Sequence, residues 1–166
     1  MEVLHLETNG ESGARSIHPR DIKLENIMRR DVVSIDMYAT LMEGLELCME
    51  HRIRHLPVID ESGRLVGMLT DRDIRHYLSP RLGTISENSA DRATLERRVH
   101  VIMVRKIVIG TPDMSLAVAA RKMLQHRVGS IPVVDSGKKV IGIVTANDFL
   151  VLMASSEPEV DEPELI

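Results

Sequence analysis

The stretch GMLTDRDI at residues 67–74 returns in altered form as GIVTANDF at residues 142–149, with glycine, threonine and aspartate at the same offsets. The match continues without a gap when the chain is shifted by 75 residues, so that residues 27–78 lie over residues 102–153. About a quarter of the aligned pairs are identical. Self-similarity at a fixed period is the signature of a repeated structural unit. The sequence therefore predicts two copies of one fold.

Each copy shows the same order of predicted elements. A short apolar run of β type comes first, at 32–35 and at 106–109, and a helix follows at 40–52 and at 115–127. Thr40 with Glu43 has the spacing of a capping box, and Ser115 is a candidate N-cap. Two strands joined by turn residues come next, and a last helix closes the unit; these spans are 55–60 with 64–69, 130–135 with 139–144, and the helices 70–78 and 145–153.

This order predicts an α/β (α+β) fold in which two β-α-β-β-α repeats pack with pseudo-twofold symmetry, because one unit alone would have a marginal core. The expected organisation is a disordered N-terminus, repeat 1, a linker with a possible short helix, repeat 2 and an acidic disordered tail. These parts are assigned to residues 1–16, 17–78, 79–101, 102–154 and 155–166, respectively.

Composition narrows the class of protein. Apolar residues make up 43% of the chain and aromatic residues only 2%, so the core must be aliphatic. The net charge of −4 and the shortage of stacking aromatics argue against nucleic-acid binding. Cys48 is the only cysteine, which excludes an internal disulfide and a multi-cysteine zinc site. Neither a signal peptide nor a membrane-spanning apolar run is evident, so we expect a cytoplasmic protein without a membrane partner.

Two longer stretches, HLPVIDESGRLVGMLTDRDI at 55–74 and SIPVVDSGKKVIGIVTANDF at 130–149, resemble the signatures of a tandem pair of cystathionine-β-synthase (CBS) domains, or Bateman module. The likeness covers residues 17–154 and is to the stand-alone prokaryotic members. It implies a regulatory module, an energy or metabolite sensor, that binds AMP, ADP, ATP or S-adenosylmethionine between its repeats and modulates an unknown partner protein. It also implies a homodimer, no enzymatic activity, no catalytic residue and no cofactor other than the regulatory ligand.

The ligand signature that the resemblance implies is Gly67, Thr70 and Asp73 in the first repeat, with Gly142, Thr145 and Asp148 in the second. A carboxylate is a pure acceptor with two oxygens, which suits the two hydroxyls of a ribose. The threonines stand at helix starts, where hydroxyl and free N–H groups can receive a phosphate. The glycines would allow a close approach of backbone or ligand.

Two composite clefts follow from the resemblance. Thr145 and Asp148 would work with Met28–Ser34 and Arg54, whereas Thr70 and Asp73 would work with Met103–Ile109 and Gly129. In the family, backbone groups of such segments contact the adenine edge, and apolar side chains form the walls. The candidates are Met28, Val33, Ile53, Leu56 and Met68 in repeat 1, and Met103, Val108, Val128, Ile131 and Ile143 in repeat 2.

Alternatives remain at this point. Thr-x-x-Asp at a strand-to-helix junction is also an N-cap arrangement that needs no ligand, which would leave a structural or protein-interaction module. No nucleophile–base pair, P-loop or metal cluster supports an enzyme, and no metal site is expected at His51 or His126. The two motifs differ in carrying Asp71-Arg72 against Ala146-Asn147, so unequal sites are expected.

Overall fold

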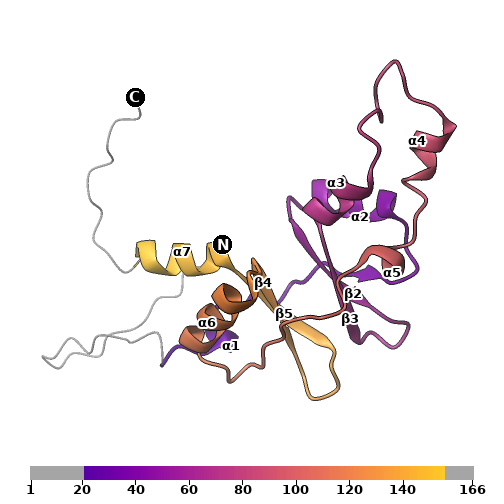
Figure 1. The fold of residues 1–166 in the computed structure, drawn as a ribbon. Coiled ribbons are helices and arrows are strands. Elements are labelled where there is room, and N and C mark those ends of the chain that lie inside the picture. Colours follow the sequence, from indigo (N-terminus) through magenta and orange to yellow (C-terminus); the bar gives the residue numbers. More distant parts are fainter. Residues whose placement is uncertain (1–20, 156–166) are drawn as a thin grey trace, which may run out of the picture.

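The computed structural model describes residues 21–155, which form two lobes (Figure 1). The N-terminus predicted to be disordered, 1–16, lies outside the described residues, and so does the tail predicted at 155–166 except for Ser155, which is the last residue of a helix. The first lobe contains β1 (Ile35–Asp36), α2 (Leu41–Glu50), β2 (His55–Ile59), β3 (Leu65–Thr70) and α3 (Asp71–Tyr77). The second lobe contains α6 (Leu116–His126), β4 (Ser130–Val134), β5 (Val140–Thr145) and α7 (Ala146–Ser155).

The two hairpins have the same register, which confirms the duplication. His55 pairs with Thr70 in the first hairpin, and Ser130 pairs with Thr145 in the second. Each hairpin also has its irregularity at the same place, between Val58 and Ile59 in one and between the equivalent residues of the other. The same irregularity in both copies indicates that the two hairpins share one backbone conformation.

The first strand of each repeat is shorter than predicted. The strand expected at 32–35 is only β1, which runs parallel to β2, and the strand expected at 106–109 is absent, leaving a single bridge from Gly110 to Val133. A missing donor explains part of this difference. In the first copy Met37 N donates to Ile59 O at 3.0 Å, but the equivalent residue of the second copy is Pro112, which has no N–H.

The helices begin where the capping pattern predicts. The Thr40 hydroxyl accepts a hydrogen bond from Glu43 N at 3.2 Å, and the Glu43 carboxylate accepts one from Thr40 N at 2.6 Å, so the capping box is complete. Ser115 caps α6 through a bond from Val118 N at 3.4 Å. The backbone and hydroxyl of Thr40 hold the pKa of Glu43 below its ordinary value.

A short segment of each repeat packs into the lobe that the other repeat forms. Helix α1 (Leu24–Ile27) and Met28 pack into the core of the second lobe, although they belong to the first repeat in sequence. Helix α5 (Val99–Ile102) and Met103 pack into the core of the first lobe in the same way. The predicted repeat boundaries therefore differ from the packed lobes, because each core includes a segment that belongs to the other copy.

Pseudo-twofold symmetry extends to individual hydrogen bonds. Leu24 N donates to Met114 O at 2.9 Å, and Val99 N donates to Ala39 O at 2.8 Å, which are equivalent pairs under the 75-residue shift. The two hairpin turns meet at the symmetry axis, where Arg64 forms a bridge with its own equivalent, Lys139. These contacts confirm the predicted symmetric packing.

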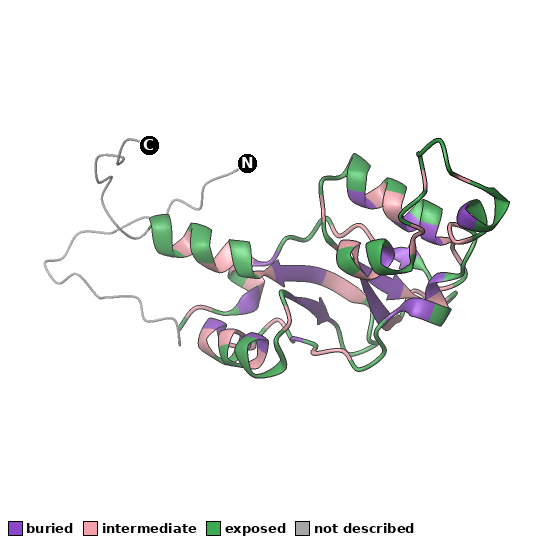
Figure 2. Ribbon diagram, turned by 45° about the horizontal axis from the view of Figure 1, so that its top comes forward, coloured by how far each residue is buried: buried purple, intermediate pink, exposed green. Residues whose placement is uncertain are grey.

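The core is aliphatic, as the composition requires. Leucine, isoleucine and valine fill both lobes, and the buried colour in Figure 2 is concentrated on the strands, whereas the outer helix faces are exposed. Cys48 belongs to the first core, and burial raises the pKa of its thiol to about 11. No helix among residues 21–155 is long and apolar enough to cross a bilayer.

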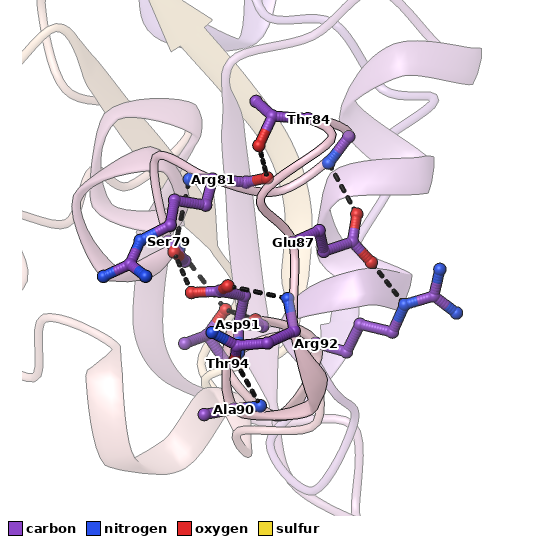
Figure 3. Close-up of polar contacts among 10 residues, drawn as sticks. Ser79, Arg81, Thr84, Glu87, Ala90, Asp91, Arg92 and Thr94 are labelled. Carbon is purple, nitrogen blue, oxygen red and sulfur yellow. Dashed lines mark hydrogen bonds and ion pairs between the residues drawn. The ribbon is translucent and has the colours of Figure 1, made fainter.

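The linker contains the predicted short helix, α4 (Ser89–Ala93), and it is internally bonded (Figure 3). Asp91 is buried, and its carboxylate accepts the Ser79 hydroxyl at 2.5 Å and Asn88 N at 2.9 Å, which lowers the pKa of Asp91. Arg92 forms an ion pair with Glu87. The linker is thus a folded connection in which the carboxylates of Glu87 and Asp91 are engaged in hydrogen bonds.

Candidate functional site

A cavity of about 690 Å³ lies where the two lobes meet, and both repeats supply its walls. Its lining comes from the ends of β3 and β5, the first residues of α3 and α7, and the loops before β2 and β4. The sequence-predicted site residues that line it are Ile53, Arg54, Met68, Thr70, Asp73, Val108, Val128, Gly129, Ile143 and Thr145. The cavity is thus composite, because both repeats contribute residues to its walls.

The first half-site is formed by Thr70 and Asp73. Asp73 Oδ2 accepts hydrogen bonds from Thr70 N at 3.0 Å and from Thr70 Oγ1 at 2.7 Å, while Asp73 N donates to that hydroxyl at 3.2 Å. This is a full capping box at the start of α3. Among the described residues, no hydrogen bond reaches Asp73 Oδ1. One carboxylate oxygen at the cavity wall therefore retains its capacity to accept.

The second half-site is formed by Thr145 and Asp148, and it has an additional member. Asp148 Oδ2 accepts from Thr145 N at 2.6 Å and from Thr145 Oγ1 at 2.7 Å, as in the first copy. Asp148 Oδ1 accepts two further bonds, from Arg29 Nε at 3.1 Å and Arg29 Nη2 at 2.9 Å. Both oxygens of this carboxylate are therefore engaged. Arg29 lines the cavity, whereas Asp148 does not.

The position of Arg29 follows from the segment exchange. Its backbone forms an antiparallel bridge with Ile143 of the second lobe, with hydrogen bonds of 3.0 Å in both directions. Val104, the equivalent residue of repeat 2, forms the same bridge with Met68 of the first lobe, with two bonds of 2.9 Å. The two half-sites thus receive matching backbone segments but different side chains, arginine in one and valine in the other.

The apolar residues that line the cavity agree only in part with those predicted from the sequence. Ile53, Val108 and Val128 line the cavity, together with Met68 and Ile143. The expectation for three other residues requires correction, because Leu56 and Ile131 are fully buried strand residues of the two cores, and Val33 packs against the first core; none of them lines the cavity.

The signature glycines make room for protein side chains. A Cβ at position 67 would lie 2.9 Å from Met103 Cγ, and a Cβ at position 142 would lie 2.8 Å from Met28 Cγ. Both methionines are buried under these contacts. Gly67, Gly142, Met28 and Met103 are therefore packing partners that do not line the cavity; the glycines were expected to allow a close approach of backbone or ligand, and the close approach is instead that of a methionine side chain.

The charge of the cavity is a property that the motif analysis found only in part, at Arg54 and Arg72. Among residues 21–155, six basic side chains line the cavity against two carboxylates, Asp71 and Asp73. The basic residues are Arg29, Arg52, Arg54, Arg72, Lys106 and Arg127. A signal was present in the sequence, since Arg52 and Arg127 are an identical pair under the 75-residue shift. Arginine and lysine at this density favour an anionic ligand, above all a phosphate.

A half-buried histidine, His55, lies between the two repeats. His55 Nε2 is 3.1 Å from the point that a Cβ of Gly129 would occupy, so the glycine makes room for the ring. Burial, followed by the neighbouring Arg54, lowers the pKa of His55. No group of three or more potential metal ligands occurs among the described residues. The cavity thus offers acceptors for hydroxyl groups, cations for anions and apolar walls, which together suit a nucleotide-like molecule.

Comparison with known proteins identifies the family. The model of the CBS domain matches residues 24–80 and again residues 99–155, which together are more than half of the chain. The chain belongs to the CBS domain family. The CBS domain-containing protein YhcV of Bacillus subtilis is 31% identical over 134 residues, covering 81% of this chain and 87% of its own length.

Solved CBS structures share the fold. The CBS domain pair of protein MJ0100, in complex with 5′-methylthioadenosine and S-adenosyl-L-methionine, has a TM-score of 0.68 at 27% identity, covering 81% of this chain and 98% of that one. CBSX2 in complex with AMP has a TM-score of 0.67 at 25% identity, again with coverages of 81% and 98%. These neighbours confirm the CBS pair architecture and its mixed α+β class.

Some CBS relatives are much longer than this chain and have the names of enzymes. The L-aspartate semialdehyde sulfurtransferase of Methanocaldococcus jannaschii is 30% identical over 126 residues, which are 76% of this chain but 22% of that protein. This chain covers less than a quarter of the length of each of the first three curated relatives. The likeness to these enzymes is therefore confined to a part of each of them.

Proposed function

We propose that this CBS pair is a regulatory module that binds an adenosine-containing ligand, AMP, ADP, ATP or S-adenosylmethionine, in the cavity between its repeats. The observation that carries the proposal is the first half-site. Among the residues that the structure describes, Asp73 Oδ1 has no hydrogen-bond partner, and this oxygen lies at the wall of a basic cavity assembled from both repeats. A ribose needs such an acceptor, and its phosphates need such cations.

Each part of a nucleotide has a matching surface. The ribose hydroxyls would donate to Asp73, and the adenine would lie between the apolar side chains of Val108 and Val128. The phosphates would extend toward the arginines and Lys106. The neighbours support the class of ligand, since the CBS pair of MJ0100 was solved with two adenosyl compounds and CBSX2 with AMP.

The charge of the cavity favours phosphate-bearing ligands within this class. S-adenosylmethionine carries a sulfonium cation, which the basic lining would repel, whereas each phosphate can form charge-assisted hydrogen bonds with arginine. We therefore rank AMP, ADP and ATP above S-adenosylmethionine. GTP serves as the comparison that separates recognition of adenine from attraction to phosphate alone.

Regulation would act through the relation between the two lobes. A ligand can shift a conformational equilibrium only by its difference in affinity for the two states. A cavity lined by both lobes meets this condition if their separation changes. The module would then modulate a partner protein in the cytoplasm without catalysing a reaction itself. Hydrogen–deuterium exchange showing no change at either lobe in saturating nucleotide would contradict this mode of action.

The proposed assembly is a homodimer through helix faces that include α7. Leu150 and Val151 on this helix have exposed fractions of 67% and 56%, which is high for apolar side chains. Burial of this face in a second copy would remove it from water. Sedimentation velocity is expected to show a dimer at micromolar concentration, and a monomer at all concentrations would contradict the assembly.

The hydrogen bonds of the two Thr-Asp motifs favour one alternative function. Both Thr-Asp motifs satisfy helix-start hydrogen bonds without any ligand, as a purely structural motif would. The alternative is a ligand-free protein-interaction module. It gives no role to the Asp73 oxygen that lacks a hydrogen bond among the described residues, or to the five basic side chains other than Arg29, so it explains less of the cavity.

Thermal unfolding in the presence of AMP, ADP, ATP, S-adenosylmethionine and GTP separates the two functions. A ligand at 100 times its Kd stabilises the folded state by about 2.7 kcal/mol. For a chain of this size that corresponds to a rise in Tm of roughly 5–10 °C. We expect this rise with the adenine nucleotides and a smaller one with S-adenosylmethionine and GTP. No shift with any of the five would favour the interaction module.

A further inference from the structure

The two half-sites are equivalent under the sequence repeat, but protein side chains bond differently to the aspartate of each. At the first, Asp73 lines the cavity, and the segment facing it presents Val104, which has no polar group. At the second, the equivalent segment presents Arg29, which donates twice to Asp148 Oδ1. The arginine lines the cavity in place of the carboxylate that it covers.

We propose that Arg29 is a built-in occupant of the second half-site, so that the module binds one nucleotide, at Thr70 and Asp73. The inference rests on the proposed function and adds its stoichiometry and the residue that sets it. It depends on one difference between the copies, arginine at 29 against valine at 104.

The hydrogen bonds show why the arginine excludes a ribose. A ribose at Asp148 would need a free carboxylate oxygen, but Oδ2 is held by Thr145 and Oδ1 by the guanidinium. The Asp148 side chain is only 13% exposed, so its pair with Arg29 is shielded from water on one side. A sugar hydroxyl would replace a charge-assisted pair with a weaker neutral donor and leave the guanidinium to find another acceptor.

The backbone allows the arginine to be removed without disturbing the fold. The segment is fixed by the two main-chain hydrogen bonds between residue 29 and Ile143, which any side chain permits. Arg29→Val recreates the arrangement that the chain already uses at Val104. The reverse change, Val104→Arg, is also accommodated, because Val104 is 47% exposed and lines the cavity.

Isothermal titration with AMP and with ATP tests the inference by counting sites. We expect one site per chain in the natural protein, two in Arg29→Val and none in Val104→Arg. The double variant Arg29→Val/Val104→Arg should again bind one nucleotide, and adding Asp148→Ala should abolish that binding. Arg30→Val is the matched control, since Arg30 bonds to Glu25 O outside the cavity, and it should retain one site.

The outcomes separate this inference from the function on which it rests. Two sites in the natural protein, or one site in a folded Arg29→Val variant, would overturn the role of Arg29 and leave nucleotide binding in place. Retained binding in Val104→Arg at natural affinity would overturn it as well. Absence of binding for both nucleotides in every variant would overturn the proposed function itself.

Discussion

Asp73→Ala is expected to weaken nucleotide binding by roughly 10²- to 10⁴-fold. The carboxylate is the proposed acceptor for two ribose hydroxyls, and a hydrogen bond to a charged group contributes about 1.5–3 kcal/mol. Two such bonds correspond to this change in Kd. Titration calorimetry with AMP and ATP, well below the Tm of the variant, measures the effect directly.

Two further variants separate the ligand role of Asp73 from its capping role. Asp148→Ala removes the equivalent cap at α7, but its carboxylate is already occupied by Arg29, so the affinity of the first site should change little. Asp73→Asn keeps an oxygen that can accept from Thr70 N but removes the charge, so binding should weaken while the cap remains. Natural affinity in Asp73→Ala, accompanied only by a lower Tm, would show that Asp73 is a cap and nothing more.

Gly67→Ala is expected to lower the free energy of unfolding by about 2–3 kcal/mol, which is the upper range for overpacking a tight core. The added Cβ would lie 2.9 Å from Met103 Cγ and 3.2 Å from Met103 Cβ. These atoms are near the backbone of a buried methionine, so the side chain cannot simply swing away. Urea unfolding monitored by circular dichroism measures the loss.

The double variant Gly67→Ala/Met103→Ala provides the control. Met103→Ala alone should destabilise by about 2–5 kcal/mol, since it leaves a cavity in the first core. The double variant should lose less than the sum of the single changes, by about 0.5–3 kcal/mol of coupling. Strict additivity would mean that the glycine is not there to accommodate the methionine.

Much of the fold was predictable because the same sequence pattern occurs in both repeats. Thr40 with Glu43 and Ser115 correctly predicted two helix starts, and the repeated Gly-x-x-Thr-x-x-Asp correctly predicted where each second strand gives way to a helix. Local chemistry of this kind is encoded by neighbours in sequence. The strand predicted at 106–109 was wrong, because apolar content alone does not fix strand pairing; only Gly110, the next residue, forms a bridge, and Pro112 lacks the N–H through which Met37 extends the pairing in the first copy.

The exchange of α1 and α5 between the cores was not predictable from local pattern. An apolar segment such as Leu24–Ile27 must be buried, but its composition does not specify which of two similar cores will bury it. The same limit applies to the site. The Thr70 and Asp73 pair was named from its spacing, whereas the contact between Arg29 and Asp148 joins residues 119 positions apart. Only the packed lobes bring them together.

The central claim is that Asp73 and the basic cavity hold the ribose and phosphate of an adenine nucleotide. A crystal structure of the protein grown in saturating AMP tests it most directly. We expect both ribose hydroxyls within about 2.5–3.0 Å of the Asp73 carboxylate, the phosphate beside the basic side chains, and Arg29 still bound to Asp148. A nucleotide whose ribose lies elsewhere, or an empty cavity with Asp73 bonded only to Thr70, would contradict it.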